Sequence, residues 1–241
     1  MSNVRRFPLF TTALSSLGLC IAAAPLHAAV TVYPDSVGDQ AGGPETDISS
    51  VEVSSDASTI SFKINLTGNI DNPGVNDWGN YHIGFDVAPG GKTTPGVGWG
   101  NPFGIGSGMD FWVGSWVNFG GGAELHQYTG DGTSNSWGPT IPGTSVTLGP
   151  NSTTITIPLS AMGLGDGSVV VFDAWSTFGA PGGQGAYDAS SNPVLAVTQP
   201  WNGTPYDAGN NVSVYVVPEP AAVTMLMGMS GAMLLAGRRR S

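Results

Sequence analysis

Apolar and polar residues alternate one by one from Thr59 to Leu66, and no other feature constrains the fold of this chain more strongly. In an extended strand, successive side chains point to opposite faces. The pattern therefore predicts a strand with one buried face and one polar face. The residues of the buried face are Ile60, Phe62, Ile64 and Leu66.

Several other short segments predict strands, and turn-forming residues separate them. We expect a hairpin between Ile48–Val53 and Thr59–Leu66, and one helical turn at Leu159–Leu164. The chain contains 37 glycines and 18 prolines, and its body lacks a convincing helical period. Short strands joined by such turns predict one all-β domain, an antiparallel β-sandwich, over residues 30–216. Further strands are expected at Tyr81–Val87, Met109–Phe119, Glu124–Tyr128, Ile155–Leu159, Ser168–Trp175 and Val212–Val216.

The first 29 residues have the three regions of a secretory signal peptide. Arg5 and Arg6 precede the apolar stretch Leu9–Ala24, and small residues end the segment at Ala28 and Ala29. This order predicts export through the secretory translocon and removal by signal peptidase. The only cysteine, Cys20, leaves with this peptide, so the exported body holds no disulfide.

The last 25 residues form a second targeting segment. Pro218, Glu219 and Pro220 precede Ala221–Gly237, which carries no charge, and three arginines follow. At ~1.5 Å per residue this apolar stretch reaches roughly 25 Å, which predicts a single transmembrane helix. The arginines, which are Arg238, Arg239 and Arg240, are expected to stay cytoplasmic and to leave the body on the other side.

These three parts, in this order, resemble the PEP-CTERM sorting signal of exported proteins in Gram-negative bacteria. The resemblance covers residues 217–241 and rests on the Pro-Glu-Pro motif, the apolar helix and the arginine cluster. It implies that exosortase, a membrane-embedded protease, recognises this segment and cuts near Pro218, Glu219 and Pro220. The body is then released or moved to the outer surface. The alternative is a plain membrane anchor.

The exported body is strongly acidic. Of the seven basic residues only Lys63 and Lys92 lie in it, against sixteen acidic residues between Asp35 and Asp207. Such a surface repels nucleic acid and anionic lipid. Neutral polysaccharides and divalent cations are compatible partners.

Four acidic residues crowd one glycine-rich segment near the start of the body. Calcium prefers carboxylates together with loop carbonyl groups, and this segment offers both. The spacing does not fit an EF-hand, and a solvated acidic turn is the alternative to a calcium site. The candidate ligands are Asp35, Asp39, Glu45 and Asp47.

Tryptophans supply the second candidate site. Trp112 and Trp116 share one face of the predicted strand Met109–Phe119, about 13 Å apart at ~3.3 Å per residue. Two rings at this distance suit stacking on an oligosaccharide. The alternative is that these rings belong to the core or pack beneath loops. Further candidates in loops are Trp78, Trp99 and Trp137.

The residues do not predict an enzyme. His82 and His126, the two histidines of the body, lack the spacing of zinc ligands. No Gly-x-Ser-x-Gly motif stands between a predicted strand and a helix. The three glutamates of the body form no close pair of the kind that glycosidases use.

A second, looser resemblance concerns the body itself. Tyr33–Asp35, Gly38-Asp39, Asp47-Ile48, Val51–Val53 and Ile60–Leu66 are similar to the opening of exported glucodextranase C-terminal and family-nine carbohydrate-binding modules. This resemblance implies a jelly-roll-like sandwich, structural calcium and sugar binding. We therefore expect a non-catalytic surface or extracellular protein of an exopolysaccharide or biofilm matrix. The alternatives are a structural matrix protein without a small ligand and an extracellular glycan hydrolase.

Overall fold

The computed structural model describes residues 29–70, 79–130, 136–178, 185–191, 206–209 and 211–219 of the chain. These residues form strands and short 3-10 turns. The strands are β1 (Thr31–Pro34), β2 (Ile48–Ser55), β3 (Thr59–Leu66), β4 (Gly79–Asp86), β5 (Phe103–Gly104), β6 (Phe111–Trp116), β7 (Gly122–Gln127), β8 (Ser145–Gly149), β9 (Ser152–Pro158), β10 (Val169–Phe178), β11 (Asp188–Ala189), β12 (Tyr206–Asp207) and β13 (Ser213–Val216). The 3-10 turns are η1 (Pro44–Thr46), η2 (Gly98–Gly100), η3 (Asn118–Gly120) and η4 (Leu159–Met162).

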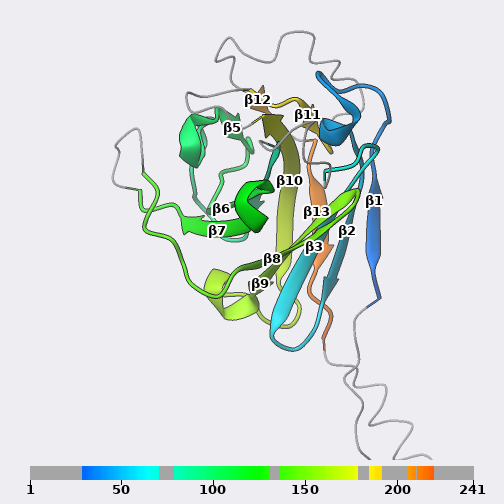
Figure 1. The fold of residues 1–241 in the computed structure, drawn as a ribbon. Helices are drawn as coiled ribbons and strands as arrows, with labels where there is room; N and C mark the ends of the chain where they lie inside the picture. Colours follow the sequence, from blue (N-terminus) through cyan, green and yellow to red (C-terminus); the bar gives the residue numbers. More distant parts are fainter. Residues whose placement is uncertain are drawn as a thin grey trace, which may run out of the picture.

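Two antiparallel sheets face each other (Figure 1). The first sheet has the strand order β1-β2-β3-β9-β8. The second has the order β11-β10-β4-β6-β7, and β13 also pairs with β10. A short parallel pair, β5 with β12, lies outside both sheets. The prediction of an all-β antiparallel sandwich is confirmed.

Alternating side chains of both sheets build the core between them. Ile60, Phe62 and Ile64 of β3 are fully buried, as their alternation predicted. The Phe62 ring lies 5.2 Å from the rings of Phe85 and Phe172, which belong to β4 and β10 of the opposite sheet. Contact of aromatic rings from both sheets is what holds the sheets face to face.

A second apolar cluster covers the outer face of the second sheet. Val113 of β6 points into the core, whereas its neighbour Trp112 packs on the other side with Phe103 and Trp175. Both faces of β6 are therefore buried, in agreement with its continuous apolar sequence. The strand ends at Trp116, earlier than predicted, because the chain turns through η3 with a positive φ at Phe119.

Strands β1 and β13 lie side by side along one edge of the sandwich. The Tyr33 hydroxyl of β1 donates a hydrogen bond to the Val214 carbonyl of β13 over 2.6 Å. Thr31 at the start of β1 and Val216 at the end of β13 lie at the same end of the molecule (Figure 1). Strand β11 lies at the opposite end of the molecule, together with the loop that follows β1 (Figure 1).

Both predicted targeting segments fall almost wholly outside the described residues. These are the signal peptide of residues 1–29, of which only Ala29 is described, and the helix Ala221–Gly237 with its flanking Pro220 and arginines. Within the part of the chain that the structure describes, no helix is both long enough and apolar enough to cross a membrane.

Replacing Phe62 with alanine tests the packing between the sheets. Because the ring is fully buried, its removal leaves a cavity, and we expect a loss of about 3–5 kcal/mol in the free energy of unfolding. Chemical denaturation followed by tryptophan fluorescence measures the loss. The control is Val32→Ala on β1, where the side chain is 56% exposed and the change should stay within about 0.5 kcal/mol. Equal stability of the two variants would contradict the assigned core.

Candidate metal centre

Three carboxylates converge at the end of the sandwich opposite the start of β1 and the end of β13. Asp39, Asp47 and Asp188 each place an oxygen within 4.8 Å of the oxygens of the other two. Asp39 lies in the loop after β1, Asp47 directly precedes β2, and Asp188 begins β11. The centre therefore joins a loop of the first sheet to a strand of the second.

The Asp47 side chain holds the loop that carries Asp39 in place through hydrogen bonds. Its two carboxylate oxygens accept hydrogen bonds from the Gly38 N–H at 3.0 and 3.2 Å. The Thr67 hydroxyl donates to Asp47 Oδ2 over 2.7 Å. Gly38 has a φ of +88°, a conformation that glycine adopts without the clash that a Cβ would cause.

Asp188 connects the two sheets. Its side chain is fully buried; Oδ2 accepts the Ile48 N–H over 2.6 Å and Oδ1 accepts the Ala189 N–H over 2.8 Å. The loop is fastened at the same place, because the Ala41 N–H donates to the Tyr187 carbonyl over 2.8 Å. The start of β2 therefore depends on a carboxylate supplied by β11.

Several carboxylate oxygens of this region are shielded from solvent and lack a partner. Among the described residues, neither oxygen of Asp39 has a hydrogen-bond partner, although the residue as a whole is half-buried. Oδ2 of Asp35 is in the same situation. Buried carboxylate oxygens without a donor are unfavourable unless a proton or a cation compensates them.

The carboxyl groups also raise one another's pKa. Burial, and then the nearby Asp35 and Asp39, raise the pKa of Asp188 to about 8. Burial raises the pKa of Asp35 to about 7, with further contributions from Asp39, Asp173 and Asp47. Several negative charges thus share one poorly solvated space, where each disfavours the ionised form of the others.

The donor set fits a hard divalent cation. All three converging side chains offer carboxylate oxygen, and neither a thiolate nor an imidazole belongs to the cluster. Calcium takes such ligands in flexible geometries and accepts six to eight oxygens, so carbonyls or water would complete its shell. Zinc prefers nitrogen and sulfur ligands and fits less well.

The structure brings together part of the predicted ligand set. Asp39 and Asp47 converge as expected, and Asp35 lies close enough to affect their charge. Glu45 is not part of the converging group: it lies buried in η1, where its backbone carbonyl accepts the Tyr81 hydroxyl over 2.8 Å. Asp188 was missed, because it is 140 residues from its partner Ile48 and no local motif marks it.

The tryptophans gather over the outer face of the second sheet. The Trp99 ring lies 5.5 Å from Trp112 and 5.7 Å from Trp116, and Trp137 lies 6.4 Å from Trp112. Trp112 is only 1% exposed, which favours the alternative that it is a core residue. The other three are half-buried, and Trp78 lies outside the described residues.

Polar groups fix these rings in place. The Trp99 indole N–H donates to Glu124, and the Trp137 indole N–H donates to the Gly96 carbonyl over 3.0 Å. His126 stacks on Trp112 with ring centres 4.6 Å apart, and its Nε2 lies 3.4 Å from Glu124 Oε1. Glu124 and His126 therefore position tryptophans in this arrangement.

No protein-family model matches the sequence, and no curated protein matches it either. The carboxylates themselves therefore carry the functional interpretation.

The raised carboxyl pKa values predict how stability depends on pH when divalent cations are removed. An unfolded aspartate titrates near pH ~3.9, whereas Asp188 titrates at about 8 and Asp35 at about 7 in the folded chain. Between these values the folded state binds more protons than the unfolded state. The contribution of these two groups to stability is therefore largest at acidic pH and falls as the pH rises toward 8, by about 1.4 kcal/mol per pH unit for each excess proton.

Urea denaturation in EDTA from pH 5 to pH 8 measures this slope. Asp188→Asn removes one of the titrating groups and should make the decline shallower. Stability that is flat or that rises over the same interval would show that burial and the neighbouring carboxyl groups do not raise these pKa values as the structure implies.

Proposed function

We propose that this protein is an exported, non-catalytic β-sandwich that is sorted by exosortase, stabilised by calcium and associated with extracellular polysaccharide. The observation that carries the proposal is the convergence of Asp39, Asp47 and Asp188, with the partnerless oxygens of Asp39 among them. The finer features belong to the same proposal: a jelly-roll-like topology, a cleaved signal peptide over residues 1–29 and a temporary transmembrane helix over Ala221–Gly237.

Calcium resolves the electrostatic problem of the carboxylate centre. A divalent cation bound by Asp39, Asp47 and Asp188 would neutralise the carboxylates, so that the carboxyl groups no longer need to stay protonated. It would also hold the loop after β1 against β11, and so join the two sheets at one end. Extracellular calcium modules typically bind with dissociation constants of about 0.1–1 mM, which suits a protein that functions outside the cell.

The end of the folded body supports processing by a protease. Val217 is the last buried residue described; its N–H donates to the Ser168 carbonyl over 2.9 Å, and its carbonyl accepts the Gly167 N–H over 2.8 Å. Pro218 and Glu219 follow at once and are exposed. Proteases act on exposed chain that is free of such hydrogen bonds. In this proposal exosortase cuts here, and the helix that follows tethers the precursor until then.

A second candidate function is a structural matrix protein without a small ligand. Val32 of β1 and Val214 and Val216 of β13 are all exposed along the edge where these strands meet. Neither strand contains a charged residue. Uncharged edge strands with exposed apolar side chains favour pairing with another chain, so this edge would serve self-association.

Calcium should stabilise the protein through the carboxylate centre. At a free calcium concentration about 100 times the dissociation constant, we expect the free energy of unfolding to rise by about 2.7 kcal/mol relative to EDTA. Denaturation with and without calcium measures the gain, which Asp188→Asn should abolish. The matched control Asp166→Asn removes one charge at an exposed position and should keep the full response. A wild-type protein that does not respond to calcium, or equal responses from the two variants, would refute the cation site.

The sorting signal is tested by replacing Pro218, Glu219 and Pro220 with alanine. We expect an uncut precursor that stays in the membrane fraction, because the motif at the edge of the helix is no longer recognised. Immunoblotting of fractionated cells that contain the exosortase measures the ratio of precursor to mature protein. Pro89→Ala, which changes an exposed proline of the body, should mature normally. Normal maturation of the triple variant would rule out recognition of this motif.

A further inference from the structure

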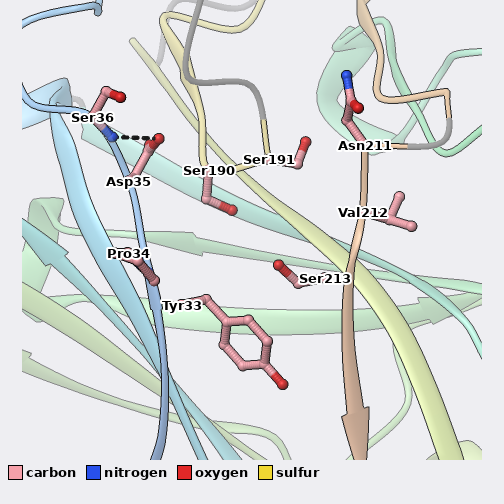
Figure 2. A pocket seen from close by; sticks show the side chains of 9 residues that line it. All are labelled: Tyr33, Pro34, Asp35, Ser36, Ser190, Ser191, Asn211, Val212 and Ser213. Atoms are coloured by element: carbon pink, nitrogen blue, oxygen red, sulfur yellow. Dashed lines mark hydrogen bonds between the residues drawn. The ribbon is translucent and has the colours of Figure 1, made fainter.

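A groove of about 550 Å³ lies beside the carboxylate centre, between β1 and the segment that enters β13. Tyr33–Ser36 form one wall, Ser190 and Ser191 lie at its end near β11, and Asn211–Ser213 form the other wall (Figure 2). Its volume falls within the range of about 300–1,000 Å³ that is usual for small-molecule sites. Of the tryptophans predicted to bind sugar, none of those that the structure describes lines it.

Several hydrogen-bonding side chains of the groove are available to a ligand. Among the described residues, Ser36, Asn211 and Ser213 make no side-chain hydrogen bond, although all three line the groove. Figure 2 shows the hydroxyls of Ser190 and Ser213 pointing into the space between the two walls. The Ser190 hydroxyl already donates to buried Asp173 over 3.1 Å, which fixes its direction. Hydroxyl and amide groups both donate and accept, so the groove can bond a ligand that does the same.

Apolar groups line the same space. The Tyr33 ring, held by its hydroxyl on β13, and the Pro34 ring lie among the hydroxyls, whereas the Val212 side chain packs against the outer apolar cluster. A lining that mixes hydroxyls, an amide, an aromatic ring and short aliphatic groups matches the surface of a sugar, which presents C–H faces and hydroxyl edges.

Charge decides which sugars fit. In the described part of the chain no lysine or arginine lines the groove, whereas Asp35 does, with its Oδ1 accepting the Ser36 N–H over 2.8 Å. Asp39, Asp47 and Asp173 lie near enough to Asp35 to interact with its charge. Uronates and phosphorylated ligands would be repelled by this group of acidic residues, whereas a neutral sugar would not.

We infer that this groove binds a neutral oligosaccharide and is the site through which the protein holds extracellular polysaccharide. The inference rests on the proposed association with polysaccharide and gives it a location. The ligand lies along the β1–β13 edge, bonds to Ser36, Asn211 and Ser213, and packs its C–H faces on Tyr33. The half-buried tryptophans Trp99 and Trp116 then serve packing, not recognition.

Titration calorimetry on the full-length chain in detergent tests the site. The probes are cellohexaose, laminarihexaose, xylohexaose and mannohexaose, with oligogalacturonate as the anionic comparison. We expect at least one neutral probe to bind and the anionic probe to fail. The double variant Asn211→Ala with Ser213→Ala should weaken binding about tenfold, since two hydrogen bonds are lost. The control variant replaces Ser145 and Thr147 with alanine; both are exposed residues of β8, at the edge of the first sheet opposite β1. This variant should bind the probes as the wild type does.

Further variants distinguish loss of the groove from a folding defect and from binding at the tryptophans. Ser36→Ala lies in a loop outside both sheets and should weaken binding severalfold by itself, so a folding defect in β13 could not account for both results. Near-ultraviolet circular dichroism verifies that each variant is folded. Binding that survives the changes in the groove but is lost in Trp99→Ala with Trp116→Ala would overturn the inference and leave the proposed function standing. Failure of every neutral probe to bind the wild type would overturn the inference together with the polysaccharide part of the proposed function.

Discussion

Contact between the apolar faces of two sheets is the interaction on which the rest of this molecule depends. The chain has a single cysteine, in the segment predicted to be removed, so burial between the sheets has to supply the stability that disulfides give to many exported domains. Phe62, Phe85 and Phe172 meet at the centre of that burial. The strands place β11 and the loop that follows β1 at one end of the sandwich (Figure 1). The start of β1 and the end of β13 lie at the other end.

This arrangement separates two tasks along the length of the sandwich. The exposed Pro218 and Glu219 follow directly on the core residue Val217, so the proposed cleavage site lies near one end. The carboxylate centre lies at the opposite end, with the groove beside it, and would face away from the membrane while the precursor is anchored. Asp35 belongs to both, because it lines the groove and interacts with Asp39 and Asp47. Occupation of the cation site would therefore also set the charge of the groove.

Local patterns could predict most of the sandwich but only part of the site. The alternation in β3 and the turn before it define the β2–β3 hairpin, whereas β8 has few apolar residues and β1, β11 and β12 are too short for their period to be recognised. Asp39 and Asp47 could be found because they are close in sequence. Asp188 could not, since only the pairing of β11 with β10 brings it to Ile48. The burial of Trp112 likewise depends on a covering loop, which the periodicity of β6 does not encode.

The central claim is that the converging carboxylates hold a calcium ion that joins the two sheets. A crystal structure determined from calcium-containing solution, with anomalous scattering recorded at long wavelength, tests it most directly. The account predicts an anomalous peak within ~2.3–2.6 Å of oxygens from Asp39, Asp47 and Asp188. Carboxyl groups that share protons in direct hydrogen bonds with one another, with no anomalous peak between them, would contradict it.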